Sequence, residues 1–142
     1  MEICKEFRFE ASHVLPHHPG KCSNLHGHSW KLTVYVKGPI DRETGMVVDY
    51  GDIKAAIQPI IDDLDHAHLG AWRTDKVEID WTNGTKTVEW LGMTMNPTSE
   101  NILIAIARQI IKRGQVFSSL TLDETCTVSC LLTWEEFNAI GR

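Results

Sequence analysis

The sequence predicts an α+β fold built from antiparallel strands and two amphipathic helices. Apolar and polar residues alternate over 3–13 and 26–38, as they do in strands that bury one face. Over 49–64, and again over 96–114, apolar residues instead recur at helical spacing. Residues 116–133 then supply two more strands, which completes the α+β pattern.

Three histidines lie on the apolar sides of the first two predicted strands. His26 and His28 share a parity with the apolar residues of 26–38, and His13 continues the apolar series of 3–13. If these strands are antiparallel neighbours, as successive strands often are, the three imidazoles converge on one face. Three protein ligands with a fourth position left open is the arrangement of catalytic zinc. For His26 and His28 alone, two histidines satisfied within a core explain the pattern equally well.

Cys22 precedes the histidine pair and lies in a loop rich in proline and glycine. A thiolate there can close the fourth position of the metal, which would make the site structural. It can equally stand beside the metal as a catalytic base. The residues leave both roles open.

The first helix ends in a cluster of acidic residues. Asp49 or Asp52 can cap its N-terminus, and Pro59 predicts a kink within it. Acidic residues at the C-terminal end oppose the helix dipole, so helix stability does not explain them. Among them, Asp65 stands directly before His66, and such pairs orient an imidazole and raise its basicity. A polar helix end is the alternative explanation for this pair.

Shorter features connect these elements. Residues 41–45 form a predicted turn, and 46–49 a predicted short strand. Asn83 and Gly84 lie between alternating β-formers, which is the strongest short-range signal for a hairpin with a type I′ turn. This hairpin would pair Ile79 with Val88 and Val77 with Trp90.

Glu124 places a carboxylate on the apolar side of a strand in the C-terminal part of the chain. It shares a parity with Leu122. Both residues follow the second predicted helix, which begins at residues 96–100. A buried carboxylate is costly unless donors pair with it, and a ligand with two neighbouring N–H groups would do so. Alternatively, Glu124 lies near the strand end and reaches water. Residues 134–142 are expected to add a short helix.

Composition limits the classes of function. The 142 residues suffice for one domain, and a hydrophobic fraction of 42% with 23% charged residues is typical of globular proteins. A net charge of −5 argues against broad nucleic-acid binding, and no apolar run approaches the length of a membrane span. The N-terminus carries no signal-peptide pattern, so we expect a cytoplasmic protein with reduced cysteines.

Taken together, these features resemble the 6-pyruvoyl-tetrahydropterin synthase superfamily, and most closely its bacterial 6-carboxy-tetrahydropterin synthase branch. The resemblance covers nearly the whole chain. It rests on ordered motifs: Phe7-Arg-Phe-Glu-Ala-Ser-His13, Cys22-x3-His26-Gly-His28, Gly45-Met-Val-Val-Asp49-Tyr, Leu64-Asp65-His66-x2-Leu69, Pro97-Thr98-Ser99-Glu100-Asn101 and Glu124-Thr-Cys126. The spacing between Cys22 and His26 resembles the 6-carboxy branch, because the pyruvoyl branch typically has a longer one.

The resemblance implies the tunnelling fold, or T-fold: a four-stranded antiparallel sheet with two helices on one face, in a single domain over 1–142. Family members assemble as trimers into a hexamer, so the resemblance implies a homohexamer. Two features depart from the family pattern. Gly70 occupies a position where asparagine is common, which would loosen the turn after His66. The insertion 71–96, with its predicted β-hairpin, is longer than usual in the bacterial branch.

The resemblance also implies a role for each candidate site residue. The implied zinc ligands are His13, His26 and His28. Cys22 is implied to be the catalytic base, activated by Asp65 and His66, which can serve the Cys22 of a neighbouring chain. The implied anchor for the amino and ring N–H groups of a pterin is Glu124, in a pocket lined by Thr98, Ser99 and Glu100.

The implied activity is that of a carbon–carbon lyase. Zinc acidifies C–H bonds next to the oxygens that it polarises, and a thiolate held by a His–Asp pair moves the protons. From 7,8-dihydroneopterin triphosphate this gives 6-carboxytetrahydropterin, acetaldehyde and triphosphate, and the product feeds queuosine and 7-deazapurine biosynthesis. The alternatives are a 6-pyruvoyl-tetrahydropterin synthase, which keeps the side chain intact, and a non-catalytic zinc-stabilised pterin-binding protein.

Overall fold

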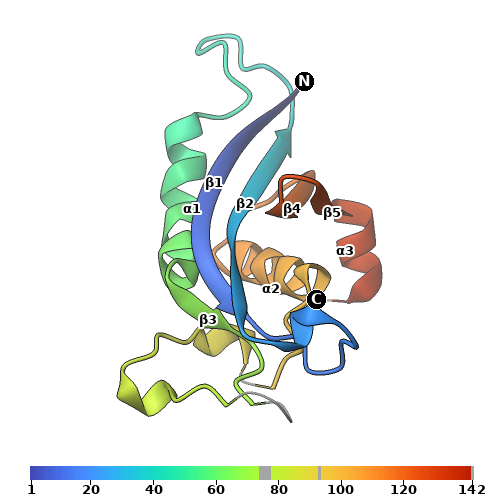
Figure 1. Cartoon of the computed structure of the whole chain (residues 1–142). Coiled ribbons are helices and arrows are strands. Elements are labelled where there is room, and N and C mark those ends of the chain that lie inside the picture. The colour runs from blue at the N-terminus through green and yellow to red at the C-terminus, as the bar shows by residue number, and fades with distance from the viewer. Residues whose placement is uncertain (74–77, 93, 142) are drawn as a thin grey trace.

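A curled sheet runs through the computed structural model, which describes residues 1–73, 78–92 and 94–141 (Figure 1). Within these residues the sheet has five strands in the spatial order β3-β1-β2-β4-β5. Their bounds are β1 Glu2–His13, β2 His26–Lys37, β3 Ala67–Leu69, β4 Ser119–Thr125 and β5 Val128–Thr133. Neighbouring strands are antiparallel except β3, which runs parallel to β1.

Two helices, α1 (Tyr50–Leu64) and α2 (Ser99–Lys112), cover one face of the sheet, and α3 (Trp134–Ile140) follows β5 (Figure 1). Each begins at a side-chain cap, provided by Asp49, Thr98 and Thr133 respectively. Of the two caps predicted for α1, Asp49 is therefore correct, and Pro59 lies inside this helix as predicted. The short C-terminal helix is also confirmed. No helix in the described part of the chain is long and apolar enough to cross a membrane.

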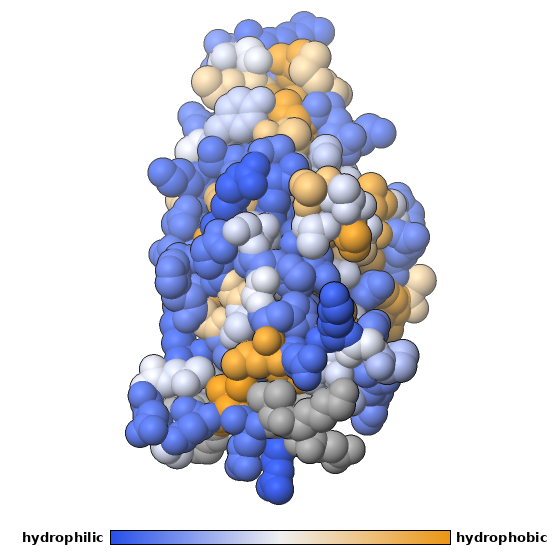
Figure 2. All heavy atoms as spheres, viewed as in Figure 1, coloured by the Kyte–Doolittle hydropathy of each residue, from blue (hydrophilic) through white to orange (hydrophobic). Residues whose placement is uncertain are grey.

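The core lies between α1, α2 and one face of the sheet. Strand residues of one parity are buried there, among them Phe9, Trp30 and Leu122. They pack against the apolar stripes of the two helices, represented by Ile57 and Ile106. The other parity carries polar and charged side chains, and Figure 2 shows a mostly hydrophilic surface over β1 and β2. This difference between the two faces is the physical basis of the predicted alternation.

Two strand predictions need correction. The expected sheet had four strands, but within the described residues it has five, because β3 joins the edge of β1. β3 has only 3 residues, all buried, so it offers no alternation to detect. The strand predicted for 46–49 is wrong, since this segment forms no strand. Instead, the Met46 carbonyl accepts from the Asp41 N–H at 2.8 Å and closes the predicted 41–45 turn.

The predicted hairpin of the insertion is also wrong where the structure describes it. Asn83 belongs to a 3₁₀ helix, η2 (Trp81–Asn83), whose cap is the side chain of Asp80. Gly84 has a positive φ of 88°, but Asn83 does not, and a type I′ turn needs both. The local Asp80 cap therefore replaces the expected turn.

Tertiary packing explains the rest of the insertion. Val88 begins a second 3₁₀ helix, η3 (Glu89–Leu91), and both Val88 and Leu91 are 5% exposed. Ile79 is buried as well, although it forms no ladder with Val88. The pairing predicted for Val77 lies outside the described residues. Burial in the core, which a local pattern cannot show, decides the conformation here.

Candidate metal centre and neighbouring groups

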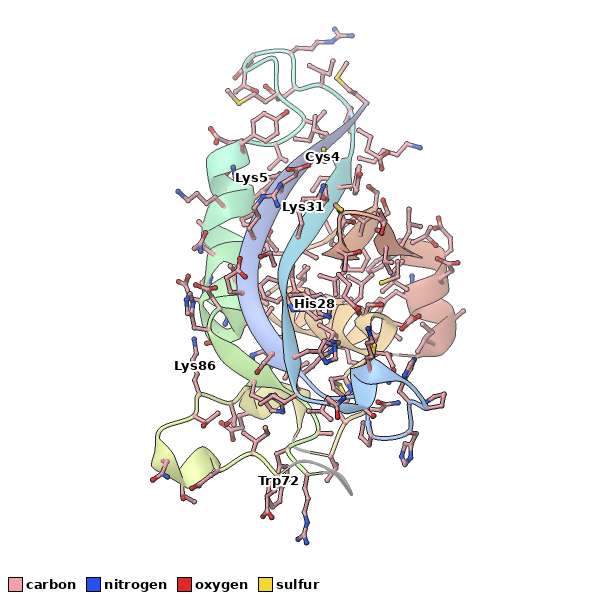
Figure 3. The ribbon with its side chains drawn as sticks, viewed as in Figure 1. Cys4, Lys5, His28, Lys31, Trp72 and Lys86 are labelled. Carbon is pink, nitrogen blue, oxygen red and sulfur yellow. The ribbon has the colours of Figure 1, made fainter. Side chains whose placement is uncertain are left out.

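β1 and β2 bring three histidines together at one end of the sheet. Their antiparallel register pairs His13 with His26 and places His28 opposite Ala11. One ligand atom from each imidazole lies within 4.8 Å of the other two. The side chain of His28 extends from β2 toward Glu124 of β4 (Figure 3). The predicted convergence of the three histidines is confirmed.

Two backbone carbonyls orient two of these imidazoles. His13 Nδ1 lies 2.8 Å from the carbonyl oxygen of Pro97, and His26 Nδ1 lies 2.7 Å from that of Asn24. A carbonyl only accepts, so each Nδ1 donates its proton and each Nε2 keeps its lone pair. Residue type carries no signal for either contact, since every residue has a carbonyl.

The free nitrogens fit a metal ion. His26 Nε2 is buried without a hydrogen-bond partner, which is costly for a polar atom unless a ligand takes its lone pair. His13 Nε2 lies 3.1 Å from His28 Nε2. Ligand nitrogens of a tetrahedral zinc site, with bonds of about 2.0–2.1 Å, lie roughly 3.3 Å apart. The three residues therefore suit a divalent ion that accepts imidazole nitrogen.

Burial keeps two of these histidines neutral. It lowers the pKa of His13 to about 4, against the opposing hydrogen bond to Pro97. It also lowers the pKa of His28, although the carboxylate of Glu124 acts in the other direction. The indole ring of Trp30 packs edge-on against both imidazoles. Neutral imidazoles carry the lone pairs that a metal needs.

Glu124 reaches the histidines from β4. Its Oε1 lies 3.3 Å from His28 Nε2, and its side chain is only 19% exposed. The pairing of β4 with β5 shifts register between Asp123 and Thr125, so Glu124 lies at an irregularity of the strand. The predicted location of this carboxylate on the apolar side is confirmed.

The N-terminus of α2 adjoins the histidines through the carbonyl of Pro97. Thr98 caps this helix, and Ser99 and Glu100 form its first turn. Glu100 also lines a separate groove of about 430 Å³ between α2, β5 and α3, and Glu124 does not line that groove. The pocket expected to join Glu124 with Thr98, Ser99 and Glu100 stays a prediction.

Gly70 allows the segment before α2 to pack closely. Its φ is +69°, and a Cβ atom at this position would lie 2.7 Å from Pro97 Cβ and 2.8 Å from the Met95 carbonyl oxygen. A larger residue would push this segment away. The departure from asparagine thus tightens the packing that holds the Pro97 carbonyl against His13, contrary to the expected loosening.

Cys22 lies in a 3₁₀ helix, η1 (Lys21–Ser23), immediately before β2. Its carbonyl accepts from the Leu15 N–H at 2.9 Å, and its side chain is half-buried. Among the described residues, the group able to hold a metal consists of the three histidines and does not include Cys22. The role of Cys22 as a base stays a prediction.

His66, with its partner Asp65, lies at a cleft lined by residues of β1, β2 and β3. Asp65 Oδ2 is 3.0 Å from His66 Nδ1, and Asp65 Oδ1 accepts from the Glu10 N–H at 2.8 Å. This backbone bond is the main reason why the pKa of the Asp65 carboxyl is lowered. The cleft has a volume of about 570 Å³ and is also lined by Glu10 and Ser12, whose parity on β1 is opposite to that of His13, and by His28 of the histidine cluster. The pair and one of the three histidines therefore border the same cleft.

Comparison with known proteins places these features in a family. A profile of the 6-pyruvoyl tetrahydropterin synthase family matches residues 2–136. The 6-carboxy-5,6,7,8-tetrahydropterin synthase of Synechocystis sp. is 39% identical over 133 residues, which cover 88% of this chain and 87% of that protein. The Haemophilus influenzae protein of the same name is 32% identical over 139 residues, covering 94% and 92%.

The fold is shared with a solved structure of the same family. Caenorhabditis elegans 6-pyruvoyl tetrahydropterin synthase matches with a TM-score of 0.70 at 24% identity, and the match covers 94% of each chain. The predicted T-fold is thereby confirmed, with the strand count corrected as above. Sequence and fold agree, and the chain belongs to the 6-pyruvoyl tetrahydropterin synthase family of enzymes.

Proposed function

We propose that this protein is a zinc-dependent 6-carboxy-5,6,7,8-tetrahydropterin synthase, a carbon–carbon lyase. It converts 7,8-dihydroneopterin triphosphate and water into 6-carboxytetrahydropterin, acetaldehyde and triphosphate. The observation that carries the proposal is the convergence of three imidazole nitrogens beside Glu124. The short spacing between Cys22 and His26, and the names of the two bacterial relatives, support the 6-carboxy branch.

The metal ligands in this proposal are His13, His26 and His28. The carbonyls that accept from Nδ1 of His13 and His26 hold these two rings with Nε2 directed into the cluster. When bound, zinc polarises hydroxyl or carbonyl oxygens of the substrate side chain and so acidifies the adjacent C–H bonds. The fourth position stays open for the substrate because the protein supplies three ligands.

Cys22 moves protons in this proposal. Asp65, 3.0 Å from His66 Nδ1, holds the ring in the tautomer with its proton on Nδ1. Nε2 of His66 can then accept the proton of a thiol and leave a thiolate. In this proposal, as the family resemblance implies, His66 serves the Cys22 of a neighbouring protomer.

Glu124 anchors the pterin. The exocyclic amine and the neighbouring ring N–H are two parallel donors that one carboxylate accepts together. Thr98, Ser99 and Glu100 complete the pocket. Thr98 has the clearest support, since it follows Pro97 directly, whereas Glu100 lines a different groove within one chain.

The proposed protein is a single domain over 1–142, with the insertion 71–96, and acts in the cytoplasm in queuosine or 7-deazapurine biosynthesis. It assembles as a homohexamer built from trimers. Edge strand β5 supports assembly, because Val128 and Leu131 are 51% and 59% exposed there. An exposed apolar edge strand is otherwise a site of unwanted association.

The activity is tested by incubating zinc-loaded protein with 7,8-dihydroneopterin triphosphate. We expect the mass of 6-carboxytetrahydropterin and one acetaldehyde for each product molecule. A product that retains the side chain would instead assign the 6-pyruvoyl activity. Pterin binding without turnover would favour the non-catalytic alternative.

Two variants distinguish the role of the metal ligands from the role of the base in the same experiment. Cys22→Ala is expected to abolish turnover and keep its zinc, whereas His26→Ala is expected to lose zinc because a ligand is gone. His17→Ala, which changes an exposed loop histidine, is the matched control for metal content. Zinc loss in Cys22→Ala would make this residue the fourth ligand.

A further inference from the structure

The C-terminal end of α1 is only partly capped by its own backbone: the N–H of Asp65 donates to the Ile61 carbonyl at 2.8 Å, but the next residue does not bond to the helix. A helix that ends at a residue of positive φ usually returns that residue's N–H to a carbonyl of the last turn. His66 has a φ of 59°, but its N–H donates to the carbonyl of Glu10 instead. The last turn also holds no basic residue, and Asp62 and Asp63 lie in it. The negative end of the helix dipole, with the carbonyl of Asp62, therefore needs a donor from elsewhere.

Lys86, in the insertion, supplies that donor. Its Nζ donates to the carbonyl oxygens of Asp62 and Asp65, the latter at 2.9 Å. Figure 3 shows the side chain of Lys86 rising from the insertion toward the end of α1. The carbonyl of Lys86 also accepts from the His68 N–H at 2.9 Å. One residue thus holds the chain on both sides of His66.

The segment that carries Lys86 is itself fixed in place. Trp90 Nε1 donates to Asp63 Oδ2 at 3.0 Å, so one of the unexplained acidic residues receives the insertion. Val88 and Leu91 belong to the core. A lysine on such a packed segment has less backbone freedom than one on a loose loop. Its ammonium group can therefore act as a stable cap.

We propose that Lys86 is a positioning residue that fixes the direction of the Asp65–His66 pair. The inference rests on the proposed function, in which this pair activates the thiol of a neighbouring protomer. The side chain of His66 is 78% exposed, so its direction depends on Asp65 and on the backbone that carries both. Glu10 holds that backbone from β1, and Lys86 holds it from the insertion. The pair then keeps one geometry when a thiol approaches.

Lys86→Met and Lys86→Arg test this role. Methionine removes the ammonium group at similar length, whereas arginine keeps donors for both carbonyls. We expect kcat of Lys86→Met to fall about 10- to 100-fold, because small displacements of a reacting group have effects of that order. KM and zinc content should stay at the wild-type level, and Lys86→Arg should recover most of kcat. Lys54→Met, at an exposed lysine of α1, is the matched control and should keep the wild-type rate.

Amide hydrogen exchange over residues 62–70 gives a readout that does not depend on turnover. Lys86→Met should speed exchange there by about tenfold, and Lys54→Met should not. Unchanged exchange in Lys86→Met would overturn the positioning role. This outcome is distinct from a failure of the proposed function, because exchange can be measured even if the wild-type protein does not convert the pterin. With active wild-type protein, faster exchange at unchanged kcat would also overturn it. A rise in KM alone would make Lys86 a substrate contact instead.

Discussion

At the scale of single residues, the role of Glu124 depends on which group its carboxylate pairs with. Its Oε1 lies 3.3 Å from His28 Nε2, and burial favours the neutral form of that imidazole. A neutral ring is a modest partner for a largely buried carboxylate. The two parallel N–H groups of a pterin would satisfy both oxygens, although the same carboxylate also lies beside a proposed metal ligand.

Glu124→Gln should separate these two roles. The amide keeps the size but turns one acceptor into a donor that faces a donor of the pterin. We expect pterin binding to weaken by about 2–4 kcal/mol, or roughly 30- to 1,000-fold, with zinc content unchanged. Titration with a pterin analogue and metal analysis of the same sample are the two measurements.

Asp123→Asn is the matched control for this variant. Asp123 precedes Glu124 on β4 but pairs with Lys31 at 3.0 Å on the other face of the sheet. Its replacement should leave pterin affinity within about threefold of wild type. A similarly small effect in Glu124→Gln would mean that the pterin is bound elsewhere, and loss of zinc would make Glu124 a metal ligand.

At the scale of elements, the insertion is part of the core and not an appendage. Val88 and Leu91 pack with core residues of the sheet and helices. The same segment adds a bridge from Thr87 to His68, the middle residue of β3. An element anchored in this way contributes to the stability of the whole chain, whereas a peripheral hairpin would contribute mainly to itself.

Val88→Ala tests the contribution of the insertion. Loss of two buried methyl groups should lower the free energy of unfolding by about 2 kcal/mol. The midpoint of thermal unfolding should then fall by roughly 4–8 °C, at fixed protein and zinc concentrations. Val116→Ala, at a valine that is 67% exposed, is the control and should stay within about 1 °C. Equal, small shifts in both variants would show that Val88 does not support the core.

At the scale of the whole molecule, the proposed site has two halves, the histidine cluster with Cys22 and the Asp65–His66 pair. The three histidines lie on the core side of β1 and β2, and His66 lines a cleft with Glu10, Ser12 and His28. In the proposed function, the Asp65–His66 pair of one protomer serves the Cys22 of a neighbouring protomer, so that the catalytic centre combines residues of two chains.

Mixing of two inactive variants tests this division. Cys22→Ala and His66→Ala should each lack activity alone, because each removes one half of every site. Co-expressed in equal amounts, they should regain about a quarter of wild-type activity, the fraction of sites that combine an intact half from each of two protomers. Separately purified and unmixed variants are the control. Mixed assemblies that stay inactive would place both halves within one chain.

What the sequence by itself determined was local in origin. Strand parity depends only on neighbours along the chain, so alternation sufficed to place His13, His26 and His28 on one face. The same reasoning placed Glu124 on the apolar side of its strand, and helical spacing located α1 and α2. The ordered motifs sufficed to indicate the family.

Only the tertiary structure decided which distant groups support the site. His13 is oriented by a carbonyl 84 positions further along the chain, and α1 is capped by Lys86 from the insertion. β3 forms because it pairs with the free edge of β1. At Asn83, the side-chain cap of Asp80 and the burial of Val88 outweigh the local turn signal. These contacts join backbone groups, which every residue has, or surfaces that meet only after folding. For that reason they leave no pattern in the order of the residues.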